Sequence, residues 1–289
     1  MHEFSLDYLA CPRCNSALEL NSFCAQTEID EGFLECHVCN LSFPIINKIP
    51  IIWDNFSKYL SVRTILGKNL FQMANHEKIK NFIKTSMSYG KTNLDRTSLE
   101  EKWTNIYRDS KRSKFYTIIK NKIARISKTS LALEYGCSIG LITKSLAKHH
   151  EIVFGIDQSY SAISFAKKSK TENLDYFVAD TLSPIFGNTK FDLVIALNLL
   201  DIVEPDKLLR HVSGQISKGF FMLSTPYDFE RGINSVRYPL NAVSLRAKLN
   251  DLGFSVYAGT KNPSYHNWNL KINSRCTLNY RVDFVMAKK

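Results

Sequence analysis

No apolar run in the sequence approaches the roughly 20 residues that a helix needs to cross a bilayer. The opening residues, MHEFSLDYLACPRC, also lack a basic stretch followed by an apolar one, which is the pattern of a secretory signal. Only 12 glycines and 8 prolines occur among 289 residues, which excludes collagen-like chains, and seven cysteines are too few for a disulfide scaffold of this length. We therefore expect a soluble, cytoplasmic protein that has no membrane partner.

Apolar residues make up 44% of the chain and aromatic residues 12%, a balance that suits a globular protein with a sizeable core. At roughly 100 to 200 residues per domain, the length favours one large domain or two unequal ones. We expect two unequal domains, because the pattern of residues changes sharply along the chain.

Acidic residues are scarce in the middle of the chain. Residues 1–53 carry a net charge of −5, residues 54–130 of +11 and residues 131–289 of +5. Lys and Arg with interleaved aromatic residues can contact nucleic acid, because the cations displace counterions from phosphates. A solvated helical face explains the same residues, and we favour it because charge alone speaks to solubility and non-specific binding. Apolar residues recur at helical spacing from Trp103 to Ile126, so we assign 54–130 as a helical connecting and lid region.

Four of the seven cysteines form two C-x-x-C pairs with 21 residues between the pairs: Cys11, Cys14, Cys36 and Cys39. This spacing is close to that of four-thiolate zinc sites, and a disulfide framework is not expected in a cytoplasmic chain. Asn15 and Asn40 follow the pairs, where the turn often needs a positive φ that asparagine tolerates. Four thiolates complete a tetrahedron and leave no position for a reacting water, so the zinc should be structural.

The surroundings of these cysteines point to a family. The runs LDYLACPRCNSALEL and GFLECHVCNLSFPIINKIPIIW resemble the small zinc-ribbon proteins that partner and activate methyltransferases, over about residues 1–53. We expect Pro44 and Pro50 to bound a short edge strand in this ribbon. So small a module buries little on its own, and metal must contribute to its folding.

From residue 131 short apolar strands alternate with helices, which indicates a mostly parallel sheet covered on both faces. Seven strands are expected, beginning with LALEYGC, EIVFGID, DYFVAD and FDLVIALNLLD. The predicted fold class is therefore α/β, with a seven-stranded Rossmann-like sheet over residues 131–289 and the small ribbon before it.

The first of these strands ends in a turn that contains Gly136, Ser138 and Gly140, and Asp157 ends the second strand about 20 residues later. This arrangement fits adenosine-type nucleotides, because glycine permits close backbone approach and an acid accepts ribose hydroxyls. The dinucleotide pattern G-x-G-x-x-G is absent. A hydrolase nucleophile at Ser138 is set aside, because no Asp and His follow in a convincing order.

The motif E-x-G-C-S-x-G, the acids after the second and third strands, and FDLVIALNLLDIVEPDKLL resemble class I S-adenosylmethionine methyltransferases over about residues 100–289. The resemblance implies that Asp157 binds the ribose, that Asp180 binds the adenine amino group and that Asn198 lies beneath the sulfonium. It also implies that four residues line the methionine end of the cofactor: Glu134, Gly136, Cys137 and Gly140.

The segments after strands four, five and six should face the methyl group, because ligands of this fold meet the carboxyl ends of the strands. The stretches N-L-L-D, S-T-P-Y-D-F and W-N-L-K-I-N-S-R resemble the N-methyltransferases that act on mercaptohistidine in ovothiol formation, although NSVRYPLNAV replaces the tryptophan- and glycine-rich segment expected after the fifth strand. The likeness implies substrate contacts from Tyr227, Trp268 and Arg275. The two aromatic residues have an equal alternative as loop anchors, because rings usually fill space.

Methyl transfer to a neutral imidazole nitrogen needs no base, whereas an ammonium or a hydroxyl acceptor needs one, and Asp201, Tyr227 or His266 could serve. Two hypotheses follow for the substrate of an S-adenosylmethionine-dependent methyltransferase. We favour a small polar metabolite whose carboxylate is held by Arg275. The alternative is RNA gripped by the ribbon and the basic segment, which the acidic ribbon disfavours. No protein partner is assigned.

Overall fold

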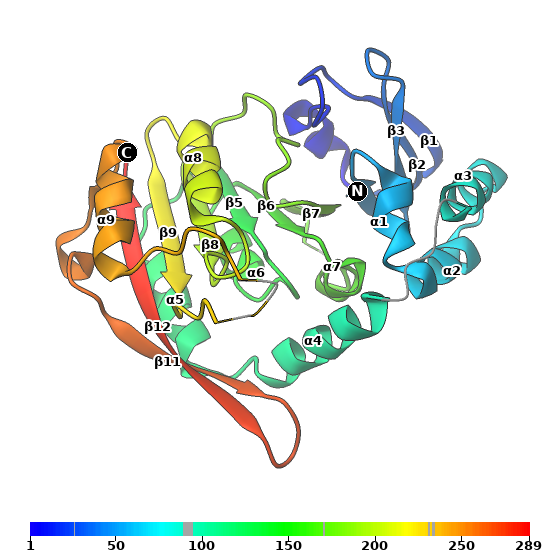
Figure 1. Cartoon of the computed structure of the whole chain (residues 1–289). Coiled ribbons are helices and arrows are strands. Elements are labelled where there is room, and N and C mark those ends of the chain that lie inside the picture. The colour runs from blue at the N-terminus through cyan, green and yellow to red at the C-terminus, as the bar shows by residue number, and fades with distance from the viewer. Residues whose placement is uncertain (26, 89–94, 170, 231, 233–234) are drawn as a thin grey trace. The chain divides into compact units, whose positions relative to one another are not determined.

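The computed structural model describes the chain in several continuous stretches: residues 1–25, 27–88, 95–169, 171–230, 232 and 235–289. Two compact units contain them. The first unit consists of Met1–Asn105 and Asp157–Thr189, and the second of Ile106–Ile156 and Lys190–Lys289. Figure 1 labels their helices and strands.

The first unit carries the cysteine-rich ribbon, whose strands β1 to β4 are antiparallel neighbours. Strand β4 then pairs in parallel with β7, with Ile51 opposite Val178 and Ile52 opposite Ala179. A strand of the ribbon therefore pairs with a strand from residues 131–289, the part of the sequence in which strands and helices alternate. The strands of this unit are β1 (Glu19–Ala25), β2 (Ile29–Cys36), β3 (Leu41–Ile46), β4 (Ile49–Ile52) and β7 (Leu174–Ala179).

The expectation that Pro44 and Pro50 bound one edge strand is wrong. Each proline lies inside a strand of the β3–β4 hairpin, whose register begins with Ile45 opposite Pro50. Asn47 and Lys48 make the turn with φ of 51° and 67°, which is the left-handed geometry that suits a tight hairpin. Because β4 has a neighbour on each side, it is an inner strand.

Helices follow the ribbon in the sequence, and one of them packs against it. Helix α3 buries Ile79 and Ile83, and Phe82 of α3 packs edge-on against Phe33 of β2 with ring centroids 5.1 Å apart. The helical elements are the 3-10 helix η1 (Glu3–Tyr8), α1 (Phe56–Ser61), α2 (Thr64–Met73), α3 (Glu77–Met87), α4 (Thr97–Asp109, which continues past Asn105) and α7 (Tyr160–Lys167).

The second unit is built on parallel strands in the order β6-β5-β8-β9, with β12 antiparallel to β9. All five residues of β5 are buried, as expected for a strand covered on both faces. Its elements are α5 (Lys114–Ile123), β5 (Leu131–Tyr135), α6 (Thr143–Ala147), β6 (Ile152–Asp157), β8 (Leu193–Leu197), α8 (Pro205–Gln215), β9 (Phe220–Thr225), α9 (Ala242–Asp251), β10 (Ser255–Val256), η3 (Ala258–Thr260), β11 (Tyr265–Lys271) and β12 (Thr277–Lys288).

Helices cover both faces of this sheet. Consecutive side chains of a strand point to opposite faces. The Tyr135 hydroxyl of β5 donates a hydrogen bond to Gln215 of α8, whereas the carboxylate of the preceding residue, Glu134, accepts one from Thr143 of α6. Helices α6 and α8 therefore lie on opposite faces, and the predicted Rossmann-like α/β fold is confirmed.

A long hairpin was not expected. Strand β11 pairs with β12 from Tyr265 opposite Asp283 to Lys271 opposite Thr277, where the sequence was assigned as a loop (Figure 1). The free edge of β11 is covered, because the backbone N–H groups of Asn269 and Lys271 donate to the hydroxyls of Ser113 and Ser110.

The sequence also predicts a strand at FSVYAG, residues 254–259, of which only the two residues of β10 are paired. The expected helical segment 54–130 contains α1 to α5 and breaks between α4 and α5. The boundaries at residues 53 and 130 stay a prediction, since the compact units divide the chain elsewhere. Among the described residues no helix is long and apolar enough to span a membrane.

Candidate metal, cofactor and acceptor sites

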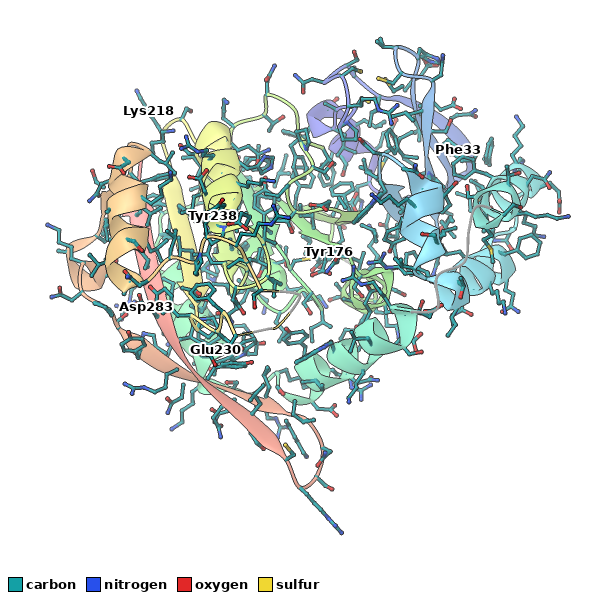
Figure 2. All side chains as sticks on the ribbon, viewed as in Figure 1. Phe33, Tyr176, Lys218, Glu230, Tyr238 and Asp283 are labelled. Carbon is teal, nitrogen blue, oxygen red and sulfur yellow. The ribbon has the colours of Figure 1, made fainter. Side chains whose placement is uncertain are left out.

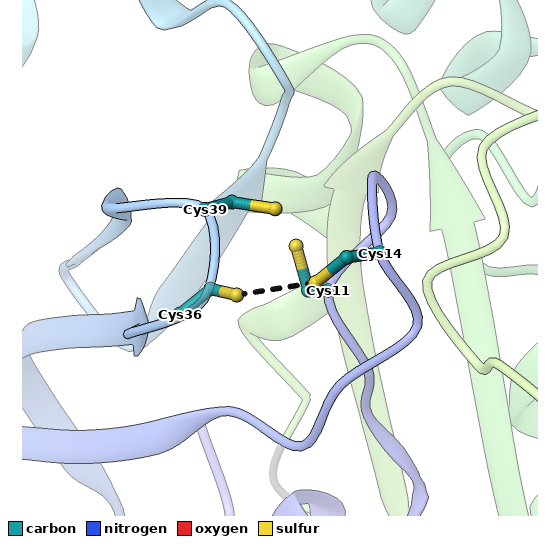
Figure 3. Close-up of side chains that lie close together, drawn as sticks. All are labelled: Cys11, Cys14, Cys36 and Cys39. Atoms are coloured by element: carbon teal, nitrogen blue, oxygen red, sulfur yellow. Dashed lines mark hydrogen bonds between the residues drawn. The ribbon is translucent and has the colours of Figure 1, made fainter.

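The four predicted zinc ligands come together. The sulfur atoms of Cys11, Cys14, Cys36 and Cys39 all lie within 4.8 Å of one another, and those of Cys14 and Cys36 are 3.4 Å apart (Figure 3). Asn15 and Asn40 have the predicted positive φ, at 63° and 52°. Zinc–sulfur bonds of about 2.3 Å place tetrahedral sulfurs roughly 3.8 Å apart, so the cluster fits a zinc ion.

The thiols of this cluster also have the electrostatics of a cation site. Hydrogen bonds from Ser16 lower the pKa of Cys14 to about 6, whereas Cys14 itself raises the pKa of Cys39 to about 12. The crowded sulfurs thus resist carrying several negative charges together, and a divalent cation relieves that repulsion. His37 is no part of the cluster, because its ring lies 2.8 Å from the Glu19 carboxylate at an exposed position.

The turn after β5 has the backbone geometry that its glycines predicted. Gly136, Ser138 and Gly140 all have positive φ, at 62°, 48° and 72°. A Cβ at Gly136 would lie 2.6 Å from a methyl carbon of Leu199, so no other residue fits this position without displacement. The N–H of Cys137 donates to the Ile156 carbonyl at 2.9 Å and ties the turn to β6.

The carboxyl ends of β8 and β9 are joined by two hydrogen bonds. The N–H of Asn198 donates to the Ser224 carbonyl, and the Ser224 hydroxyl donates to Asn198 Oδ1, both at 2.8 Å. Asn198 has a φ of 55°, which asparagine tolerates better than most residues. Nearby in the sequence, Asp201 is buried, with 2% of its surface exposed.

The two predicted cofactor acids belong to the first unit. Asp157 accepts a hydrogen bond from the N–H of Ser159 at 2.9 Å, and Ser159 caps α7 by accepting a hydrogen bond from the N–H of Ala162. Asp180 is exposed and accepts from the N–H of Leu182 at 2.8 Å. Each acid fixes the loop that follows its strand, and their roles toward ribose and adenine stay predictions.

Tyr227 lies two residues beyond β9 and has a φ of 55°, which is unusual for an aromatic residue. Its hydroxyl donates a 2.7 Å hydrogen bond to Asp283 of β12. Burial and the Asp283 carboxylate raise the pKa of this phenol, so it stays protonated at neutral pH. Burial lowers the pKa of His266, another predicted base on this unit, which favours the neutral form of its imidazole.

Trp268 and Arg275 lie on the β11–β12 hairpin. Trp268 is 7% exposed, donates to the Tyr116 hydroxyl at 3.2 Å and stacks on Tyr280 with ring centroids 5.6 Å apart. This is the surrounding expected of the anchoring alternative. Arg275 is exposed in the turn between the strands. The substrate roles of both residues stay predictions.

Sequence reasoning missed the groups that hold Tyr227. Asp283 is fully buried, and Arg246 of α9 donates to both of its oxygens at 2.8 and 3.1 Å. These residues lie 37 positions apart, so no spacing connects them. The available signal was an acid inside the apolar run of the last strand, VDFVMA, because a buried charge needs a partner.

Comparison with known families and structures identifies the two parts of the chain. Residues 133–222 match the family model for a methyltransferase domain. The chain contains a methyltransferase domain. Residues 3–47 match the model for Trm112p-like proteins, which agrees with the predicted ribbon. The methyltransferase class and the zinc-binding module predicted from the sequence are confirmed at this level.

Individual relatives match more distantly. A ubiquinone biosynthesis O-methyltransferase of Coxiella burnetii is 32% identical over 91 residues, which are 30% of this chain and 39% of that protein. The chain thus spans well under half the length of the curated relatives it matches.

Solved structures share the fold of the methyltransferase domain. The magnesium protoporphyrin IX methyltransferase of Synechocystis PCC 6803 with bound SAH has a TM-score of 0.51 and 17% identity, and the match covers 67% of this chain and 95% of that one. A complex of the Haloferax volcanii Trm112 methyltransferase activator with a putative methyltransferase has a TM-score of 0.53 and 14% identity, covering 67% and 96%. At these identities the likeness is one of fold.

Proposed function

We propose that the chain transfers the methyl group of S-adenosylmethionine to a nitrogen of a small polar, amino-acid-like metabolite. The observation that carries methyl transfer is the edge formed by the carboxyl ends of β5, β8 and β9, where Gly136, Asn198 and Tyr227 have left-handed backbone conformations. Such conformations are costly for residues other than glycine and cluster where a ligand or a reaction requires them.

The cofactor supplies an electrophilic methyl group on a sulfonium, and the chain binds it and orients the acceptor. Gly136 and Gly140 allow the turn after β5 to approach the cofactor closely, and Asp157 offers a carboxylate to the ribose hydroxyls. Positioning the nucleophile in line with the methyl group supplies much of the rate acceleration.

The pKa shifts of the candidate bases bear on which acceptor nitrogen the site can use. The raised pKa of Tyr227 disfavours a phenolate base, and the lowered pKa of His266 leaves a neutral imidazole able to accept a proton. Asp201 is the third candidate. An imidazole nitrogen attacks without any of them, which supports an acceptor such as mercaptohistidine.

RNA is the second candidate substrate, because a specific surface of the second unit favours it. Residues 252–282 contain no acidic side chain, and β11 lies against the basic turn 110–114 through Ser110 and Ser113. Lys111 and Arg112 are exposed there and could contact phosphates.

The ribbon supports the methyltransferase domain from within the same chain. Its strand β4 pairs with β7, and Tyr160 of α7 donates to the Ile46 carbonyl of the ribbon at 3.3 Å. In this proposal the zinc ion is structural, and the ribbon buttresses the domain as a separate activator would.

Incubation of the full-length protein with methyl-labelled S-adenosylmethionine tests the substrate class. The acceptors are L-histidine, 5-mercapto-L-histidine, a cell metabolite extract and total RNA in separate reactions. Mass spectrometry should find the label on an amino-acid-like nitrogen compound. Label in nucleosides of digested RNA, with none in small metabolites, would replace the proposal by the second candidate.

A further inference from the structure

The phenol of Tyr227 belongs to a closed hydrogen-bond network inside the second unit. Asp283 Oδ2 accepts from Tyr227 at 2.7 Å and from Arg246 at 2.8 Å, while Oδ1 accepts from Arg246 at 3.1 Å and from the Ser264 N–H at 3.0 Å. Asp283 of β12, which is labelled in Figure 2, is fully buried. With four donors the carboxylate is satisfied, so it has no capacity left for a substrate.

This network lies at the carboxyl edge of the sheet. Asp283 stands opposite Thr225, the last residue of β9. The preceding residue of β9, Ser224, bonds both backbone and side chain of Asn198. Asp283 is therefore level with the strand ends that meet ligands in this fold.

A tyrosine hydroxyl has one proton to donate and two lone pairs that accept. The proton of Tyr227 is committed to Asp283, and Arg246 prevents Asp283 from turning away, because breaking a buried ion pair is costly. Any further hydrogen bond to the phenol oxygen of Tyr227 can therefore only be accepted by it.

We propose that Asp283, through its ion pair with Arg246, is a positioning residue that fixes the Tyr227 hydroxyl as a hydrogen-bond acceptor for an N–H group of the methyl acceptor. The inference rests on the proposed function. On an imidazole, Tyr227 accepts the N–H of one ring nitrogen, which fixes the tautomer and leaves the lone pair of the other nitrogen for the methyl group.

The site thus discriminates by hydrogen-bond polarity. An acceptor that presents an N–H group gains a hydrogen bond, whereas a carboxylate at the same place would set lone pairs against the phenol oxygen. Sites built around one buried polar group reject the wrong partner strongly, because the group is then left unpaired.

The kinetic test uses 5-mercapto-L-histidine as acceptor with the full-length protein. Tyr227→Phe should lower kcat/KM about 10- to 100-fold, and calorimetry should find S-adenosylmethionine affinity unchanged. Asp283→Asn should lower kcat/KM by the same factor. The double variant should have a kcat/KM no lower than that of Tyr227→Phe, because Asp283 acts through the phenol. Tyr257→Phe, on a tyrosine beside β10, is the matched control and should behave as wild type. Full turnover by Tyr227→Phe, or additive losses in the double variant, would overturn the proposal.

A second measurement needs no substrate and so separates this inference from the proposed function. Tyrosine labelled with 13C at Cζ gives one NMR signal per residue, and the signal missing from Tyr227→Phe identifies Tyr227. Between pH 9 and about 10.5 this signal should keep the chemical shift of a protonated phenol. An ordinary tyrosine has a pKa of about 10 and would begin to ionise in this range, whereas burial and Asp283 disfavour the phenolate of Tyr227. Titration of Tyr227 at an ordinary pKa would refute the network, whether or not mercaptohistidine is methylated.

Discussion

In the ribbon four thiols from two short turns lie within 4.8 Å of one another. At the carboxyl edge of β8 and β9, Asn198 and Ser224 hold each other by two internal hydrogen bonds, and Tyr227 is held by a buried ion pair. The ribbon depends on an ion that binds from solution, whereas the edge depends on groups that the chain itself supplies. Perturbations should therefore act differently on the two regions.

The largest effect is expected at the metal cluster. Cys36→Ser should release the zinc and loosen the ribbon, because structural zinc contributes about 10–16 kcal/mol of apparent binding free energy to folding. Elemental analysis should find about one zinc per wild-type chain and much less in the variant, and hydrogen exchange should rise in β1 to β3. Cys24→Ser is the control, since Cys24 is exposed and lies outside the cluster. Metal-free wild-type protein with an intact ribbon would contradict this prediction.

The next effect concerns a charge buried beneath the ribbon. Asp175 of β7 is fully buried and accepts hydrogen bonds from Lys167, from the Ser5 hydroxyl at 2.8 Å and from the N–H of His2 at 2.7 Å. Asp175→Asn should lower the free energy of unfolding by about 1.5–3 kcal/mol, because Lys167 loses a charged acceptor and keeps the Glu28 carboxylate at 2.6 Å. Asp206→Asn, at an exposed ion pair, should change stability by less than about 1 kcal/mol.

The effect of Asp175→Asn on the free energy of unfolding should depend on pH, because the pKa of Asp175 is shifted. Lys167 holds the pKa of Asp175 below its ordinary value despite the burial that opposes it. A depressed carboxyl pKa stabilises the fold above the unfolded pKa of about 3.9, and the stabilisation is lost as pH falls through the folded pKa. Denaturant unfolding should therefore find a large difference between wild type and Asp175→Asn at pH 7 and a shrinking one below about pH 4. A difference independent of pH would show that shape, not charge, is at stake.

These two regions also differ in what sequence reasoning could reach. The spacing of the four cysteines, together with Asn15 and Asn40, was sufficient to predict the metal-binding turns of the ribbon. Each turn is formed by residues that are neighbours in the sequence. The glycine-bearing turn after β5 was equally local. The β3–β4 hairpin was missed because proline was taken as a boundary, although Pro44 lies before the register of the hairpin begins.

Pairings between distant segments were beyond reach. The alternation of HNWNLK in β11 is a strand signal, with Trp268 and Leu270 buried between exposed asparagines, but Asn and Lys have low strand propensity and obscured it. The bond between Tyr227 and Asp283 joins residues 56 positions apart. Only the sheet register brings these groups together, so the identity of the residues alone could not predict it.

A smaller effect is expected from the cofactor acid. Asp157→Ala should weaken S-adenosylmethionine binding about 10- to 100-fold, because a hydrogen bond to a charged group contributes about 1.5–3 kcal/mol. Titration calorimetry measures the change, and the exposed Asp54→Ala serves as a control. Unchanged affinity in Asp157→Ala would indicate that another residue binds the ribose.

The smallest effects separate the two substrate classes by their dependence on charge. If RNA is the substrate, the basic residues make several phosphate contacts, and RNA binding should fall steeply between roughly 50 and 200 mM salt. If an amino-acid-like molecule is the substrate, salt should matter little, whereas Arg275→Lys should raise the Michaelis constant a few-fold because lysine lacks the planar fork that grips a carboxylate.

We expect the second pattern from initial rates measured with 5-mercapto-L-histidine at both salt concentrations. The matched comparison is a variant with Lys111, Arg112 and Lys114 all changed to Gln, which removes three charges from the first turn of α5 and the loop before it. That variant should keep wild-type kinetics toward the metabolite, because the three side chains that it replaces are exposed to solvent. Lost activity in the triple variant beside an unaffected Arg275→Lys would instead assign the basic turn to substrate binding and favour RNA.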